Sequence, residues 1–237
     1  MQPLAEKLAE AYSAAHPNVQ IDIQGGGSGV GVKSAGDGTV DIGNVSRKVK
    51  DEELQQYPDL KPVQIAIDGV AVVVNPSVTV SGLTAAQVKD IFTGKVTNWK
   101  EVGGADKAIV VVAREEGSGT RDFFQEHFFG KDKEAQILAE AILQSSNGAV
   151  RTTVATTPDS IGFLSFGYID QSVKALAIDG VEATEANVYN GTYGATRPFV
   201  MATKGDPTGE VKAFLDWILG PEGQEVVKKA GYFALKG

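Results

Sequence analysis

Hydrophobic residues recur every three or four positions in several stretches of the chain, and this spacing predicts amphipathic helices. Leu4, Leu8 and Tyr12 form such a pattern near the start, and His16 followed by Pro17 ends it. Further helices are expected over residues 83–94, 118–129, 134–144 and 211–218, from Pro221 onward, and as short segments after residues 24–27 and 46–50. The predicted helices are therefore spread along the whole sequence.

Short apolar or alternating runs lie between these helices and predict β-strands. The alternation in "VQIDIQ" (residues 19–24) predicts one strand, and "VDIGNV" (residues 40–45) predicts another. Residues 61–76 form an apolar stretch long enough to cross from one sheet to another, and further strands are expected over residues 108–113, 160–166, 173–178 and 196–203. Strands that alternate with helices indicate an α/β class with helices packed on both faces of the sheets.

Two long apolar stretches, residues 66–74 and 196–203, are the expected domain boundaries. If the chain crosses between two lobes at both, lobe 1 is discontinuous and consists of residues 1–69 plus 197–237, and it encloses lobe 2, residues 70–196. A chain of 237 residues is long enough for two lobes, each with its own core. Such a pair of crossings predicts a two-strand hinge with a cleft between the lobes.

Charge and composition exclude several classes of partner. The formal net charge of -8 argues against a nucleic acid or an anionic membrane, which both need a basic face. The sequence has no cysteine, which excludes disulfides and thiolate metal sites. No apolar run reaches the ~18 residues of a membrane span, and "MQPLAEKLAEAY" has no signal-peptide pattern. A small anion is still compatible, because aimed N–H groups act locally whatever the net charge.

The stretch "AREEGSGTRDFF" (residues 113–124) lies where a predicted strand gives way to a predicted helix. The first N–H groups of a helix lack internal partners and carry partial positive charge, which suits a bound anion. Arg114 adds a charged, two-pronged donor. This stretch therefore predicts an anion site formed by Arg114, Ser118, Gly119 and Thr120, with Arg121 close by.

Two other loops follow predicted strands in the same way. "QGGGSGVGVKS" (residues 24–34) is a glycine turn that enters a helix, and "DIGNVSRK" (residues 41–48) ends a strand with a hydroxyl and a guanidinium. The residues that these loops offer are Gly27, Ser28, Ser46 and Arg47. In open α/β sheets ligands gather at such strand ends, so the three loops together predict a site for a small oxyanion.

Each loop also has a simpler interpretation when it is taken alone. Ser118 could serve only as a helix cap while Arg114 pairs with Glu115 or Glu116. The glycine loop could be only a flexible turn, and it matches neither common nucleotide-binding motif. The loop at residues 41–48 could be only a polar turn with a solvated Arg47. The occurrence of three such loops in one chain is what favours a ligand site.

An enzyme acting on an oxyanion would need a nucleophile with a base, or a metal cluster. The sequence has two histidines, His16 and His127, and no clustered carboxylate pattern. Glu115 and Glu116 are adjacent on an extended segment, so their side chains point in opposite directions. We therefore expect a binding protein without cofactor or metal, and a phosphate-ester hydrolase is the enzymatic alternative.

An ordered set of segments resembles the phosphate-binding subunit of the bacterial high-affinity phosphate ABC transporter. These segments are "PLAEKLAEAY", "VQIDIQGGGSGVG", "VDIGNVSR", "IFTGKVTNWKEVGG", "AREEGSGTRDFF", "PDSIGFLSFGY" and "RPFVMATKGDP". The resemblance implies a two-lobed periplasmic-binding-protein fold (type II-like) that closes on inorganic phosphate and delivers it to a membrane permease. It also implies a periplasmic or cell-surface location and a monomer. A receptor for another tetrahedral oxyanion and a non-binding scaffold are the alternatives.

Carried over position by position, the resemblance implies which residues contact phosphate. Glu116 stands where the family has an acidic residue that holds the binding arginine. Ser46 stands where longer members have an aspartate that accepts the phosphate proton, whereas shorter members have Ser-Arg. The implied ligands are Ser28, Ser46, Arg114, Ser118, Gly119 and Thr120, and the supporting residues are Gly27, Arg47, Glu116 and Arg121. Of the acids in these motifs, Glu116 is best placed to repel unprotonated sulfate if Arg114 does not fully engage it, so a strong preference for phosphate is expected.

Members of that family begin with a strand and a turn before the segment that matches "QPLAEKLAEAY", and Met1 falls just after that turn. The first strand of lobe 1 is therefore expected to be missing. Unpaired backbone groups at a sheet edge are costly. We expect another strand to complete the sheet, either a shifted segment of this chain or a segment of a second copy.

Overall fold

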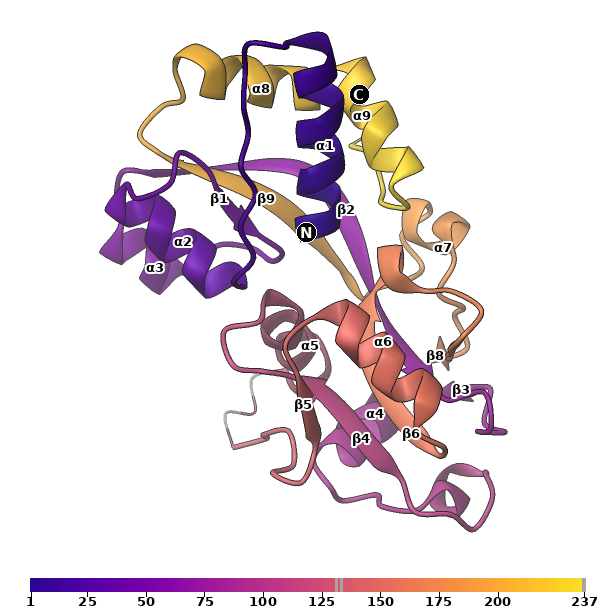
Figure 1. Ribbon diagram of the computed structural model, residues 1–237. Coiled ribbons are helices and arrows are strands. Elements are labelled where there is room, and N and C mark those ends of the chain that lie inside the picture. Colours follow the sequence, from indigo (N-terminus) through magenta and orange to yellow (C-terminus); the bar gives the residue numbers. More distant parts are fainter. Residues whose placement is uncertain (131, 133, 236–237) are drawn as a thin grey trace. The chain divides into compact units, whose positions relative to one another are not determined.

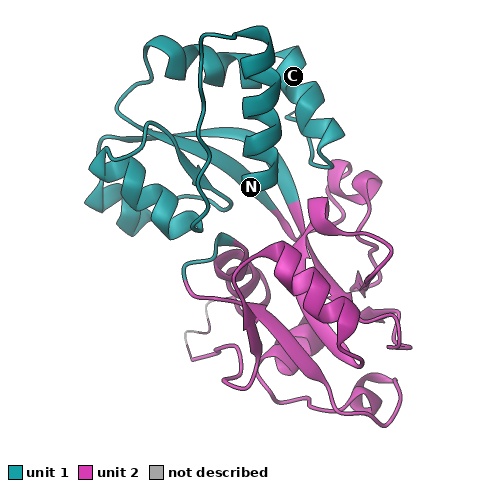
Figure 2. Cartoon of the chain, in the orientation of Figure 1, with its two compact units in different colours: residues 1–68, 117–119, 197–237 teal, residues 69–116, 120–196 magenta. Residues whose placement is uncertain are grey.

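The computed structural model describes residues 1–130, 132 and 134–235. Its contacts divide the chain into two compact units (Figures 1 and 2). Unit 1 comprises Met1–Asp68, Gly117–Gly119 and Arg197–Gly237, and unit 2 comprises Gly69–Glu116 and Thr120–Thr196. Strands β2 (Leu60–Val74) and β9 (Thr196–Lys204) each begin in one unit and end in the other. The predicted lobes differ from these units mainly by the turn 117–119, and their independence as domains stays a prediction.

Unit 1 is built around three strands in the order β1-β9-β2, of which β1 (Gly43–Val45) is antiparallel to β9. Alternate residues of β9 serve two cores: Phe199 and Met201 pack in one, Val200 and Ala202 in the other. The first core is covered by α1 (Gln2–Ala15), α8 (Gly209–Leu219) and α9 (Pro221–Lys229), and α2 (Ser28–Asp37) and α3 (Asp51–Gln56) lie beside the second (Figure 1).

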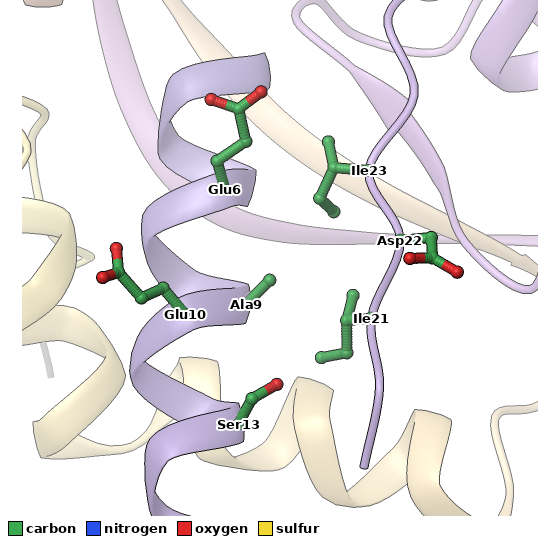
Figure 3. A pocket seen from close by; sticks show the side chains of 7 residues that line it. All are labelled: Glu6, Ala9, Glu10, Ser13, Ile21, Asp22 and Ile23. Atoms are coloured by element: carbon green, nitrogen blue, oxygen red, sulfur yellow. The ribbon is translucent and has the colours of Figure 1, made fainter.

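Among the described residues, the sheet of unit 1 ends at β1, which pairs only with β9. The predicted strand over residues 19–24 is wrong, because this segment is extended but pairs with no strand that the structure describes. Figure 3 shows it running beside α1, with a cavity of about 380 Å³ between them. The cavity is lined by Glu6, Ala9, Glu10, Ser13, Ile21, Asp22 and Ile23. The prediction that a shifted segment completes the sheet is therefore wrong for the described residues, and completion by a second copy stays a prediction.

Unit 2 contains a sheet in the order β2-β6-β4-β5, with β7 (Lys174–Ala175) also paired to β2. Strand β6 (Ser160–Ser165) is antiparallel to β2, whereas β4 (Val110–Arg114) is parallel to both β6 and β5 (Ile142–Gln144). A separate parallel pair joins β3 (Gly82–Leu83) to β8 (Ala177–Ile178).

Helices cover the sheet of unit 2. Val150 and Val154 of α6 (Asn147–Thr156) pack against Val112 of β4. An aromatic cluster joins α4 (Ala85–Phe92) and α5 (Gly119–Phe129) to β6, and within it the rings of Phe124 and Phe163 stack at 4.0 Å. The unit also contains α7 (Glu185–Tyr189) and two 3-10 turns, Trp99–Val102 and Phe166–Tyr168.

The predicted helix over residues 134–144 is wrong. Ile142–Gln144 instead forms β5, paired in register with Val112–Arg114 of β4. The Ala, Glu and Leu residues of this segment favour a helix, but pairing with a buried strand overrides that weak preference. Helix α6 was not predicted either, because its Val and Thr residues have low helix propensity. None of the helices in the part of the chain that the structure describes is both long and apolar enough to cross a membrane.

Candidate functional site

In unit 1, the glycine loop brings a buried hydroxyl to the start of α2. Gly27 has a φ of 98°, a conformation that glycine adopts readily and other residues rarely do. Ser28, the first residue of α2, is only 1% exposed. Its Oγ accepts a hydrogen bond from the Ser46 backbone N–H at 3.0 Å and lies 3.3 Å from the Ser46 Oγ. The two predicted serines of unit 1 therefore form a hydroxyl pair, which we call the serine pair.

The turn 117–119 belongs to the same unit and lies against the serine pair. A Cβ atom placed on Gly119 would come within 2.0 Å of the Ser28 Oγ and 2.9 Å of the Ser46 Oγ. Glycine allows this close approach, because a side chain here would force the two serine side chains to move. Ser118 is buried beside it, and Gly119 is the first residue of α5, where backbone N–H groups lack helical partners.

In unit 2, Arg114 ends strand β4 and is 7% exposed. Its Nε and Nη2 each donate to one carboxylate oxygen of Glu115 at 2.7 Å. The same two nitrogens also donate to the backbone carbonyls of Gln144 and Ser145 at 3.2 and 3.4 Å. These four bonds fix the guanidinium group and do not involve its Nη1.

The acidic partner of Arg114 differs from the predicted one. Glu116 is exposed, and Glu115 makes the ion pair, so the assignment of Glu116 to this role is wrong. Burial works to raise the pKa of Glu115, but the hydrogen bonds and the charge of Arg114 outweigh it and lower that pKa. Glu115 therefore stays ionised and paired at neutral pH.

In unit 2, Thr120 makes a polar contact with Asn147, a residue that was not predicted from the sequence. Asn147, the first residue of α6, donates from Nδ2 to the Thr120 Oγ1 at 3.5 Å. Its Oδ1 accepts from the Ser165 backbone N–H at 3.3 Å. All three residues are buried. The cluster "SSNG" at the start of a helix was the signal that could have identified Asn147.

Two predicted arginines bind protein groups. Arg47 donates through Nη1 and Nη2 to the carboxylate of Glu53 at 2.8 and 2.7 Å, which attaches the loop after Ser46 to α3. Arg121 donates from Nη1 to the backbone carbonyl of Arg114 at 2.9 Å. Both therefore support the loops that carry the predicted ligands, as does Gly27.

The predicted residues supply hydroxyls, helix N-termini and one guanidinium, which are the groups that bind an oxyanion. Among the described residues, no group of three or more His, Cys, Asp or Glu side chains could hold a metal ion. His16 and His127 lie elsewhere, stacked on Tyr12 and Phe123. Neither the cavity beside α1 nor a smaller one of about 190 Å³ beside α3 touches the predicted ligands.

Comparisons with known proteins agree with this chemistry. The PBP superfamily domain matches residues 1–222. The phosphate-binding protein PstS of Bacillus subtilis is 38% identical over 98% of this chain and 77% of the relative. A phosphate ABC transporter substrate-binding protein from Clostridium perfringens, solved with bound phosphate, has a TM-score of 0.93 at 44% identity and covers 99% of this chain and 96% of its own. An ABC-type phosphate transport receptor from Vibrio cholerae has a TM-score of 0.83 at 33% identity, with coverage of 99% and 96%.

Proposed function

The chain belongs to the PBP superfamily and, within it, to the family of PstS phosphate-binding proteins, and from this premise we propose that it binds inorganic phosphate for an ABC transporter. It has the two-lobed α/β fold of that superfamily, as the sequence predicted. Like its relatives it is a binding protein and not an enzyme, and phosphate is its ligand, with no cofactor.

The observation that carries the proposal is the buried Arg114, which Glu115 and two carbonyls hold while its Nη1 stays outside these bonds. A fixed guanidinium binds an oxyanion with little loss of side-chain entropy. We propose that one phosphate ion takes its contacts from Ser28, Ser46, Arg114, Ser118, Gly119 and Thr120. Gly27, Arg47, Glu115 and Arg121 then position those groups.

We also propose where the protein acts and which partner it meets. One similar protein is a phosphate ABC transporter substrate-binding protein, and the resemblance implies a location outside the cytoplasm, so we place this protein in the periplasm or at the cell surface. There it would act as a monomer and hand phosphate to the membrane permease of the transporter.

Calorimetric titration with phosphate tests the function. The wild-type chain should bind one phosphate, and Arg114→Ala should weaken binding at least about tenfold, because a charged hydrogen bond to the ion is lost. Arg151→Ala, which removes a partly exposed arginine paired with Asp170, is the matched control and should bind as the wild type does. Absence of phosphate binding by the wild type, or turnover of a phosphate ester, would overturn the proposal.

A further inference from the structure

The segment that joins β5 to α6, residues 144–147, carries an inference about how unit 2 holds its ligand groups, and this inference rests on the proposed function. Two backbone carbonyls of this segment accept hydrogen bonds from Arg114 at 3.2 and 3.4 Å. Asn147 then places its Nδ2 3.5 Å from the Thr120 Oγ1. One short segment therefore contacts two of the residues that we propose as phosphate ligands, the first through its backbone and the second through a side chain.

The orientation of the Asn147 amide follows from what lies at each of its ends. The Ser165 backbone N–H lies 3.3 Å from one end and can only donate, so the atom that faces it is the acceptor Oδ1. The Nδ2 group is then the end that faces Thr120. Asn147 is 7% exposed and Thr120 is 2% exposed, so both side chains are held by protein groups more than by water.

This orientation decides what the Thr120 hydroxyl can do. The hydroxyl has one proton to donate and two lone pairs, whereas an amide NH2 group donates and does not accept. With Nδ2 in front of it, the hydroxyl turns a lone pair toward Asn147 and its proton points elsewhere. At 3.5 Å the contact is long for a hydrogen bond and contributes little to stability. Its effect is on direction, because it excludes the rotamer in which the Thr120 O–H points at Asn147.

We propose that Asn147 is a positioning residue for phosphate binding, and that its amide keeps the Thr120 hydroxyl as a donor to the ligand. An oxyanion binds more tightly to donors that are already directed at it, because less side-chain entropy is lost on binding. Asn147 acts through Thr120 and not through a contact of its own with the ion.

The experiment is a double-mutant cycle in which phosphate affinity is measured by calorimetric titration. Asn147→Asp keeps an acceptor for the Ser165 N–H but turns a carboxylate oxygen toward Thr120, so the hydroxyl proton moves from the ligand to that oxygen. Thr120→Val removes the hydroxyl, and the loss that Asn147→Asp still causes in that background is due to the added charge alone. Asn147→Asp should weaken phosphate at least about tenfold more in the wild type than in Thr120→Val, the value of one charge-assisted hydrogen bond.

Two further variants sharpen the cycle. Thr120→Ser keeps the hydroxyl, so Asn147→Asp should weaken phosphate in that background as much as in the wild type. Asn147→Ala repeats the cycle without an added charge. It should weaken phosphate about threefold or more in the wild type, because the hydroxyl is then free to turn, and this loss should vanish in Thr120→Val.

Asn75 is the matched control, because it is also 7% exposed and its amide holds the other end of α6. Its Nδ2 donates to the backbone carbonyls of Val154 and Ala155 at 2.8 and 2.9 Å. Asn75→Asp should lower the free energy of unfolding in urea but change phosphate affinity by less than about twofold, since it has no contact with Thr120 to alter.

The outcomes separate this inference from the proposed function. If the wild type binds phosphate and Asn147→Asp weakens it by the same factor in the wild type and in Thr120→Val, the inference is wrong and the function stands. A loss of affinity in Asn75→Asp as large as that in Asn147→Asp would also overturn the inference, because it would trace the effect to the stability of α6. A wild-type chain that binds no phosphate would overturn the proposed function itself.

Discussion

Two buried arginines form ion pairs with carboxylates, and the pairs differ in what surrounds them. The Nε and Nη2 of Arg197 donate to the same oxygen of Asp68 at 2.9 and 2.8 Å, and both side chains are 0% exposed. Arg114 pairs with its neighbour in the chain, and in that pair the side-chain exposures are 8% for Arg114 and 36% for Glu115. The Asp68–Arg197 pair is fully buried inside unit 1, and we call it the sealed pair. The Arg114–Glu115 pair is partly exposed to solvent.

The difference separates the structural role of Arg197 from the binding role that we propose for Arg114. Asp68 and Arg197 lie on β2 and β9, the two strands that leave unit 1, so their pair joins these strands where they leave. A buried charge that loses its partner is strongly destabilising. A pair with an open side can direct its charge to a ligand at a small cost in stability. The contrast therefore predicts a large loss of stability when the buried pair is broken and smaller effects elsewhere.

The largest effect is expected for Asp68→Asn, which removes the carboxylate charge paired with the buried guanidinium of Arg197. The free energy of unfolding in urea should fall by about 3–5 kcal/mol. Asp216→Asn removes an exposed partner of Lys212 on α8 and should change it by less than about 0.5 kcal/mol. A loss below about 1 kcal/mol for Asp68→Asn would show that the sealed pair does not hold the two strands together.

Gly119→Ala should affect binding more than stability. The new methyl group would lie 2.0 Å from the Ser28 Oγ, so the serine pair must shift away from the ligand. Phosphate affinity measured by calorimetry should drop at least about tenfold, the value of one charge-assisted hydrogen bond. At Gly194 an added Cβ meets only the ring of His127 at 3.6 Å, and Gly194→Ala is the control that should bind normally. Normal affinity in Gly119→Ala would place the ligand away from this turn.

Glu115→Gln should have a smaller effect, and one that depends on pH. The pKa of Glu115 is lowered in the fold, so its pairing with Arg114 stabilises the protein above the ordinary glutamate pKa and is lost as the pH falls through the lowered value. Because the pair is partly open, the loss at neutral pH should be roughly 0.5 kcal/mol in urea unfolding and should vanish in acid. Glu116→Gln is the control, and an equal loss in both variants would contradict the assignment of the ion pair to Glu115.

The smallest effect concerns hydrogen exchange in the extended segment that runs beside α1 in unit 1. The backbone amides of residues 20–24 donate to no backbone carbonyl in the described chain, whereas those of β9 lie inside the sheet. Mass-spectrometric exchange should label the first segment rapidly and β9 slowly. Slow exchange over residues 20–24 would mean that another strand pairs with them in solution, as expected from a second copy.

The sequence predicted elements well where the pattern of one segment decides its structure. The spacing of Leu4, Leu8 and Tyr12 predicted α1 because these side chains face one core. The alternation in residues 19–24 predicted a strand wrongly, because a strand also needs a partner edge that the described chain does not provide. β5 was not predicted because its local pattern is helical, and the strand that it pairs with, β4, lies about 30 residues earlier in the chain.

The candidate site shows the same limit. Its hydroxyls, glycines and Arg114 stand out in the sequence because they follow predicted strands. The sequence does not show whether Glu115 or Glu116 pairs with Arg114, because this depends on which side of β4 the guanidinium group occupies. Asn147 was missed because it joins Thr120 from α6, a helix that the sequence analysis did not predict.

The sealed pair also has a consequence for how the chain is assembled. Asp68 and Arg197 are the residues at which unit 1 breaks off and resumes, and their side chains lie 2.8 Å apart. Apart from the turn 117–119, the chain between them is an insertion whose two ends arrive at one spot. Insertions with adjacent ends can be removed or exchanged with little disturbance of the host. We therefore predict that unit 1 would accept a short linker, or a different domain, in place of unit 2.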